Sequence, residues 1–215
     1  MTYFEKVTNK FQNLKYMNED RANFIRDFMH KNQVENVLEL GFFQGKSSAY
    51  FAAIMEDQGK GHLTTIDMHY AAKRKPSISE VLKKLGLSHR VDMIYAQRSY
   101  TWELGKMLQQ TPRPQFDLCY LDGGHTWDVT GYGFVIVDML LKPGGWIIFD
   151  DLDWTISKSL KGRPISGTCW KGYSDDEQNS KGVRMVWELI VPHLKYVNRF
   201  EESRFAWGIA QKPTK

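Results

Sequence analysis

The chain has 215 residues, of which 42% are hydrophobic and 25% charged, and its formal net charge is +4 at pH 7. This composition is typical of a globular protein with a real hydrophobic core, and the charge is milder than the concentrated basic excess of most nucleic-acid-binding proteins. No apolar run approaches the roughly 20 residues that span a bilayer, and the N-terminus is too polar for a signal peptide, so we expect a cytoplasmic protein without a membrane or nucleic-acid partner.

The first expected element is a helical N-terminal segment over residues 1–33. Asn18 is a suitable N-cap for a helix with the sequence EDRANFIRDFMHK, which begins at the next residue. Four phenylalanines in this segment could cover the core or a partner subunit, so a homo-oligomer stays open: Phe4, Phe11, Phe24 and Phe28.

From residue 34 onward, short apolar runs alternate with amphipathic stretches, which is the pattern of strand–helix units that build a parallel sheet. The expected strands are 34–40, 62–67, 90–96, 116–121 and 146–150. The expected helices between them are 46–56, 79–85, 100–110 and 127–141. The basic cluster at 73–76 is expected to be a solvated loop.

The C-terminal third begins with a long polar segment, residues 154–182. We expect it to be a lid on the side of the substrate, because it carries aromatic and basic side chains and because long loops in compact domains tend to be functional; a mobile surface loop is the alternative. A helix over 183–194 follows, and then two strands over 195–202 and 204–212. The turn between them, Glu201 to Ser203, is short enough to predict a hairpin.

The first strand ends in the loop ELGFFQGKSS, which contains two glycines. A dinucleotide fingerprint requires G-x-G-x-x-G, and Phe42 and Phe43 occupy the region of its second glycine. A P-loop requires G-x-x-x-x-G-K-[ST]. This loop is one residue shorter, which changes the ring of backbone N–H groups that would hold a phosphate. A P-loop nucleotide hydrolase is therefore a remote alternative.

Acidic residues at the ends of the first two strands favour a different cofactor. Glu39, followed by glycines that allow close approach of the backbone, suits a ligand with an ammonium group. Asp67 ends the second strand, where acidic residues accept hydrogen bonds from ribose hydroxyls. The alternative is that both are solvated strand ends.

Four motifs occur in order within residues 35–151: VLELGFFQGKSS, TTIDMH, FDLCYLDGGHTWD and LLKPGGWIIFDD. With these motifs the sequence resembles the class I S-adenosylmethionine-dependent methyltransferases, most closely their small O-methyltransferase-like branch. The resemblance implies a Rossmann-like, doubly wound α/β sheet of seven strands, mostly parallel with an antiparallel C-terminal hairpin strand. Since no repeat or linker is visible, residues 1–215 are expected to form one such domain.

The resemblance also implies the residues that bind the cofactor S-adenosylmethionine. The methionine part is expected near the glycine loop, the ribose near the second strand, and the adenine near the segment after the third strand. The expected residues are Glu39, Gly41, Gly45, Ser47, Asp67, Gln97, Arg98, Ser99 and Asp122.

Acidic residues also end the fourth and fifth strands, at Asp122 and at Asp150 and Asp151. Ligands bind at the carboxyl ends of the strands in an open α/β sheet, and carboxylates that converge there repel one another unless a cation lies among them. A hard divalent ion with these three ligands is expected, Mg²⁺ or else Ca²⁺ or Mn²⁺. A solvated strand end is the alternative.

Metal-dependent O-methyltransferases of the catechol type have an Asp at the fourth strand, a Lys three residues later and an Asp-Asn pair at the fifth strand. This chain resembles them but has His125 in place of the Lys and a second acid in place of the Asn. We expect Asp122 and His125 to be catalytic, with His125 as general base toward a substrate hydroxyl, with or without a metal. A capped turn is the alternative.

The expected activity is methyl transfer from S-adenosylmethionine to a hydroxyl of a small molecule, which could be an aromatic, sugar or natural-product acceptor. Two alternatives share the fold: an RNA methyltransferase, which the mild charge disfavours, and a non-catalytic cofactor-binding protein, which the intact acidic residues disfavour.

Overall fold

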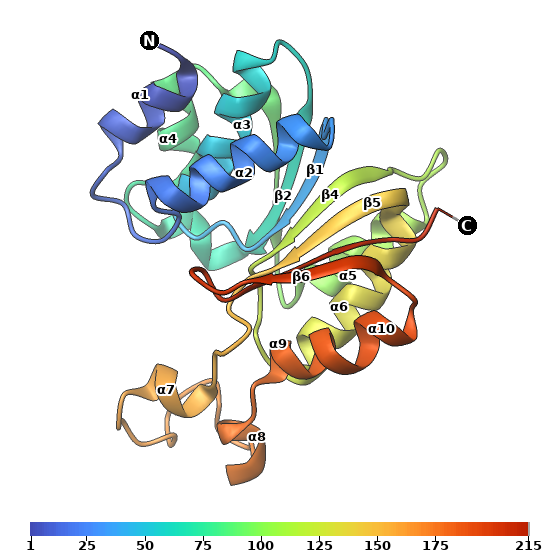
Figure 1. Ribbon diagram of the computed structural model, residues 1–215. Coiled ribbons are helices and arrows are strands. Elements are labelled where there is room, and N and C mark those ends of the chain that lie inside the picture. The colour runs from blue at the N-terminus through green and yellow to red at the C-terminus, as the bar shows by residue number, and fades with distance from the viewer. Residues whose placement is uncertain (215) are drawn as a thin grey trace.

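Seven strands form one sheet in the computed structural model, which describes residues 1–214 (Figure 1). The strands are β1 (Asn36–Leu40), β2 (His62–Met68), β3 (Val91–Ala96), β4 (Phe116–Leu121), β5 (Leu141–Phe149), β6 (Val197–Glu202) and β7 (Trp207–Gln211). Their spatial order is β3-β2-β1-β4-β5-β7-β6. The first five strands are parallel, and β7 runs antiparallel to both β5 and β6. The predicted fold class is confirmed.

Helices cover both faces of this sheet, as expected for a doubly wound fold. They are α1 (Tyr3–Lys10), α2 (Glu19–Lys31), α3 (Lys46–Asp57), α4 (Ile78–Leu85), α5 (Tyr100–Leu108), α6 (Trp127–Leu140), α7 (Ile156–Leu160), α8 (Asp175–Asn179), α9 (Gly182–Met185) and α10 (Val191–His193). Short 3₁₀ turns lie at His69–Lys73 and Ser88–Arg90, and a π-helical turn at Val186–Ile190 joins α9 to α10. The predicted helices are present, with ends shifted by at most two residues.

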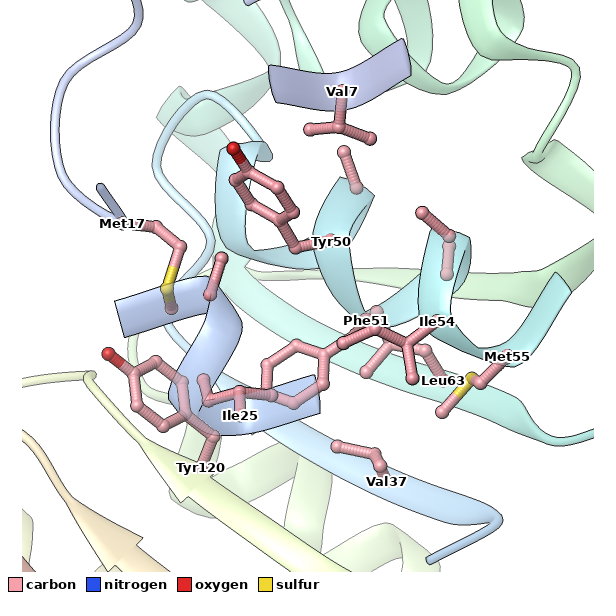
Figure 2. Packing of buried hydrophobic residues seen from close by; sticks show 14 of the residues in the cluster. Val7, Met17, Ile25, Val37, Tyr50, Phe51, Ile54, Met55, Leu63 and Tyr120 are labelled. Atoms are coloured by element: carbon pink, nitrogen blue, oxygen red, sulfur yellow. The ribbon is translucent and has the colours of Figure 1, made fainter. Parts of the chain in front are cut away.

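Alternation along the strands divides the core into two layers. In β4, Leu118 and Tyr120 pack with helices α1 to α4, whereas Cys119 and Leu121 pack with α5, α6 and the helices before β6. Figure 2 shows the first layer, in which Phe51 of α3 and Ile25 of α2 lie beside Tyr120. The carboxyl ends of the parallel strands stay uncovered between the two layers.

Helix α1 lies within the segment 1–33 that was expected to be helical, although no separate helix was assigned there, and it closes the first layer. Thr2 caps it in a capping box with Glu5, and the carboxylate of Asp57, at the end of α3, accepts the N–H groups of Tyr3 and Phe4 at 2.8 and 2.9 Å. Three of the four N-terminal phenylalanines are buried in the core of this chain, and the fourth, Phe24, is partly buried.

The C-terminal hairpin has a longer turn than predicted. Glu201 and Glu202 belong to β6, where they pair with Gly208 and Trp207, so the turn lies at 203–206 and not at 201–203. Among the described residues, no helix is long and apolar enough to cross a membrane.

Candidate active site

A cleft of about 1590 Å³ runs along the carboxyl ends of the five parallel strands. Ligands bind at this edge in open α/β sheets. The strand ends supply the floor of the cleft, and segments distant in sequence supply its walls. The predicted site residues that line it are Gly41, Asp67, Gln97, Arg98, Ser99, Asp122, His125, Asp150 and Asp151.

The glycine loop after β1 is held against the loop after β4. Gly41 has φ +95°, and a Cβ at this position would lie 2.3 Å from the backbone oxygen of Asp122. Only a residue without a side chain therefore allows the two loops to approach this closely. Gly45 (φ +85°) is the N-cap of α3, lies against Ile78 and does not line the main cleft. Ser47 lies beside it and lines a small adjoining cavity.

Asp67 shapes the glycine loop from the end of β2. Its Oδ2 accepts the N–H groups of Phe42 at 3.0 Å and Phe43 at 2.7 Å. Asp67 also lines the cleft, at the place where the ribose of the cofactor is expected. After β3, Ser99 caps helix α5 by accepting the N–H of Thr101.

Glu39 lies elsewhere than the sequence led us to expect. Its side chain is fully buried and points away from the cleft toward α3, because strand alternation places it on the face opposite to Leu38 and Leu40. The carboxylate accepts hydrogen bonds from the hydroxyl groups of Ser48 and Thr65. Burial raises the pKa of Glu39 to about 7, and these hydroxyl groups reduce the shift. In this structure Glu39 therefore joins β1 to β2 and α3.

Asp122, His125 and Asp151 converge at the ends of β4 and β5. His125 Nε2 lies 3.6 Å from Asp122 Oδ1 and 3.3 Å from Asp151 Oδ2, and one ligand atom of each residue lies within 4.8 Å of the others. Neither contact has the geometry of a hydrogen bond, so among residues 1–214 the buried Nε2 atom has no hydrogen-bond partner. These three side chains could hold a metal ion.

The charges of this cluster act on one another. Burial and the charge of Asp150 raise the pKa of Asp122, against the effect of the neighbouring imidazole. Burial lowers the pKa of His125, but the carboxylates around it, Asp122 first, outweigh burial and raise it above its ordinary value. Too much negative charge is therefore gathered here for the acidic groups to ionise freely, which favours a proton or another cation among them.

Asp150, expected as a ligand, does not belong to this cluster. It is 2% exposed, and its carboxylate accepts hydrogen bonds from Arg21 Nη1, the Tyr120 hydroxyl and the Asp151 N–H. Asp151 has a left-handed backbone with φ 57°, which turns the chain between the two acids. The two successive carboxylates consequently face different partners. The third member of the cluster is His125 and not Asp150.

An aromatic row leads from His125 into the segment 154–182. The imidazole stacks on Trp154 with ring centroids 5.1 Å apart, Trp154 meets Trp170 at 5.5 Å, and Trp170 meets Tyr173 at 5.9 Å. All three aromatic residues line the cleft. Figure 1 shows α7 and α8 of this segment on a lobe that projects from the body of the molecule.

Several residues that line the cleft were not predicted from the sequence. Tyr16 and Arg21 contribute from the N-terminal segment and Arg74 from the basic loop that was expected to be solvated. The Arg74 guanidinium lies 3.8 Å from the centroid of the Phe43 ring, and Tyr16 meets the same ring edge-on at 5.0 Å. These contacts join positions far apart in the chain, so no local motif could have indicated them.

Comparison with known proteins decides the family. A family model described as a methyltransferase domain matches residues 38–152, which run from β1 past the end of β5 and make up more than half of the chain. The chain belongs to this methyltransferase family. The enzyme class expected from the motifs, an S-adenosylmethionine-dependent methyltransferase, is confirmed. Among curated proteins, none matches the sequence.

Solved structures share the fold over nearly the whole chain. An O-methyltransferase from Bacillus cereus, solved with S-adenosylhomocysteine, is 18% identical in sequence and matches with a TM-score of 0.66. The match covers 98% of this chain and 90% of the Bacillus cereus chain. The O-methyltransferase TomG from Streptomyces achromogenes, solved with S-adenosylmethionine, has 18% identity, coverages of 98% and 89% and the same TM-score. MycE of the mycinamycin pathway, solved with Mg, S-adenosylhomocysteine and mycinamycin VI, has 14% identity, coverages of 99% and 55% and a TM-score of 0.61.

Proposed function

We propose that this methyltransferase transfers the methyl group of S-adenosylmethionine to a hydroxyl group of a small molecule that contains a ring. The observation that carries the proposal is the convergence of Asp122, His125 and Asp151 in the cleft where the strands end. The cited O-methyltransferases with bound cofactor support it by their common fold.

Methyl transfer from a sulfonium is an in-line displacement with a neutral thioether as leaving group. No acid is needed for departure, so the protein has two tasks: to place the acceptor oxygen on the methyl–sulfur axis and to remove its proton. Positioning alone can contribute several kcal/mol. His125 is suited to the second task because the neighbouring carboxylates stabilise the imidazolium that forms when the neutral ring takes the proton of the hydroxyl.

The residues of the cluster also fit a divalent cation. Two carboxylate oxygens and an imidazole nitrogen converge, and the nitrogen is buried without a hydrogen-bond partner among the described residues. Imidazole and carboxylate together suit Mn²⁺ or Zn²⁺ at least as well as Mg²⁺. A bound ion would lower the pKa of the acceptor hydroxyl. His125 Nε2 has one lone pair, so it would serve either as a ligand or as the base.

The size and lining of the cleft support a ring-containing acceptor. Its volume of about 1590 Å³ exceeds the roughly 300 to 1,000 Å³ of a typical ligand pocket, so cofactor and acceptor fit together. The aromatic row of Trp154, Trp170 and Tyr173 offers ring faces directly beyond His125. We include in the proposal that residues 154–182 are the acceptor-side lid.

The first test is calorimetric titration with S-adenosylhomocysteine and, separately, with ATP and Mg²⁺. We expect micromolar binding of the first and none of the second. Binding of ATP alone would mean that the short glycine loop is a phosphate loop after all, and would reject the proposal.

The chemical step is tested by transfer of labelled methyl groups to a panel of phenolic and glycosidic acceptors. We expect His125→Ala to abolish transfer while S-adenosylhomocysteine still binds, because His125 lies on the acceptor side of the site. Loss of activity in EDTA and its recovery with Mn²⁺ would support the metal-assisted form. Full activity in EDTA would reject the metal and leave His125 as base.

A further inference from the structure

Arg21 contacts several separate segments near the strand ends. It lies in the first turn of α2, where Asn18 accepts its N–H at 3.0 Å. Its Nη1 donates to Asp150 Oδ2 at 3.0 Å and Oδ1 at 3.4 Å, and its Nη2 donates to the backbone oxygen of Phe205 at 3.1 Å. The guanidinium also lies over the Trp207 ring, 5.4 Å from its centroid. One side chain thus joins α2, the end of β5 and the turn before β7.

The partner of Arg21 is the most deeply buried acid of the site. The side chains of Arg21 and Asp150 are 23% and 3% exposed. Removing one partner of such a pair leaves a buried charge without compensation, which is strongly unfavourable. Asp150 therefore has a permanent partner, and its oxygens are occupied by Arg21, Tyr120 and Asp151.

Asp150 in turn controls the backbone of the next residue. Its Oδ1 accepts the N–H of Asp151 at 2.7 Å, and Asp151 has the left-handed backbone that non-glycine residues rarely adopt (φ 57°). This conformation directs the carboxylate of Asp151 toward His125, 3.3 Å from Nε2. The contacts run in one chain from Arg21 through Asp150 to Asp151 and His125.

We propose that Arg21 and Asp150 are a positioning pair: Arg21 keeps Asp150 away from the cluster of Asp122, His125 and Asp151, and Asp150 fixes the turn that presents Asp151 to that cluster. Asp150 is thus a support of the site and not one of its ligands. The measurement of kcat rests on the proposed methyl transfer, whereas the measurements of amide hydrogen exchange and of Mn²⁺ affinity do not.

The first experiment measures hydrogen exchange of the backbone amides around Asp151 in the metal-free protein. We expect faster exchange at Asp151 in Arg21→Gln and in Asp150→Ala, with Arg21→Lys closer to the wild type because lysine keeps the charge. Arg204→Gln is the matched control, since Arg204 is an exposed arginine in the turn before β7 and its side chain pairs with Glu202 and not with Asp150. Unchanged exchange in both test variants would overturn the proposal.

The second experiment measures Mn²⁺ affinity by the electron paramagnetic resonance of the free ion. We expect Asp151→Asn to weaken binding by about tenfold or more, the loss expected for a ligand. We expect Asp150→Asn to change it much less, because the amide oxygen of Asn still accepts the N–H of Asp151. Equal loss in the two variants would make Asp150 a ligand and overturn the proposal. Should the wild type bind no Mn²⁺, the metal-assisted form of the proposed function fails, and the exchange experiment alone decides the role of Arg21.

The third readout separates positioning from cofactor binding. We expect Arg21→Gln to lower kcat by about tenfold or more, because small displacements of catalytic groups have large effects on rate, while the Kd for S-adenosylhomocysteine is unchanged. Partial recovery of kcat in Arg21→Lys supports the pair. A full kcat in Arg21→Gln would overturn it.

Discussion

Glu39 is a carboxyl group without exposed surface, and its pKa is raised by burial from 4.5 to about 7. Between these values the folded protein holds a proton that the unfolded chain has released, so this group lowers the stability as the pH rises through that window. The two pKa values limit the effect to about 3 kcal/mol. We expect Glu39→Gln to be more stable than the wild type at pH 8, by about 1 to 3 kcal/mol, and nearly equal to it at pH 5.

Urea unfolding of the cofactor-free protein at both pH values tests this expectation. Gln keeps an acceptor for Ser48 and Thr65, so the comparison isolates the charge. Glu188→Gln, at an exposed position, is the control and should shift the stability equally at the two pH values. The same shift at pH 5 and pH 8 in Glu39→Gln would contradict the assignment.

Position 41 requires glycine for two reasons: its backbone conformation and its close contact with the loop after β4. Gly41 and Gly59 both have positive φ, +95° and +72°, but a Cβ at Gly41 would lie 2.3 Å from the Asp122 oxygen, whereas among the described atoms none comes within 4 Å at Gly59. Gly59→Ala should therefore cost about 1 kcal/mol for the backbone alone. Gly41→Ala should cost about 2 kcal/mol more, because it also forces the two loops apart. Thermal or urea unfolding measures both, and equal costs would show that the loops separate freely.

At the scale of elements, ion pairs fasten the two ends of the segment 154–182. Asp153 accepts from Lys181 Nζ at 2.8 Å and Arg184 Nε at 3.0 Å, and a Cβ on Gly182 would lie 2.7 Å from the His125 backbone oxygen. The two ends of the proposed lid are thus held together beside the loop that carries His125. Partly exposed pairs are worth about 1 kcal/mol or less each, so the closure is weak enough to open.

We expect Asp153→Asn to speed tryptic cleavage within 154–182 by about fivefold, corresponding to about 1 kcal/mol of lost closure, with the thermal midpoint nearly unchanged. Asp176→Asn removes a charge in α8 that takes no part in the ion pairs of Asp153, and it is the control. Mass spectrometry of the early fragments identifies the cut sites. Equal cleavage rates in the two variants would mean that the pairs do not govern the opening.

The sequence predicted most elements because their signals are local. Five buried strands and the helices between them have the right hydrophobic period, and glycine or a capping residue marks several of their ends. The helices α7 and α8 were not assigned from the sequence, and neither was α1 as a separate helix. For α1 a local signal was available, the T-x-x-E capping box of Thr2 and Glu5. What holds this short helix in place is not local: Asp57 reaches Tyr3 and Phe4 from the end of α3.

At the scale of the whole molecule, the strand topology explains how much of the site could be predicted. Residues that end parallel strands must meet at one edge, so Asp67, Asp122 and Asp151 could be assigned to one cleft from their places in the sequence. The pairing of Asp150 with Arg21 could not be predicted, because the two residues are 129 positions apart in the chain. The direction of the Glu39 side chain could not be predicted for a related reason: a position at a strand end does not decide which face of the sheet a side chain occupies.

Both ends of the chain form the walls of one cleft, Arg21 from the N-terminal segment and Trp170 from the C-terminal third. A ligand that binds this cleft binds the folded state and not the unfolded chain, so it stabilises the whole fold. At a concentration of about 100 times its Kd, S-adenosylhomocysteine should contribute about 2.7 kcal/mol, which for a chain of this size raises Tm by about 5 to 10 °C. Scanning fluorimetry with ATP and Mg²⁺ in parallel measures this. A larger shift with ATP would place a nucleotide phosphate in the glycine loop, whereas a shift with S-adenosylhomocysteine that is lost in Gly41→Ala ties the stabilisation to the approach of the β1 and β4 loops.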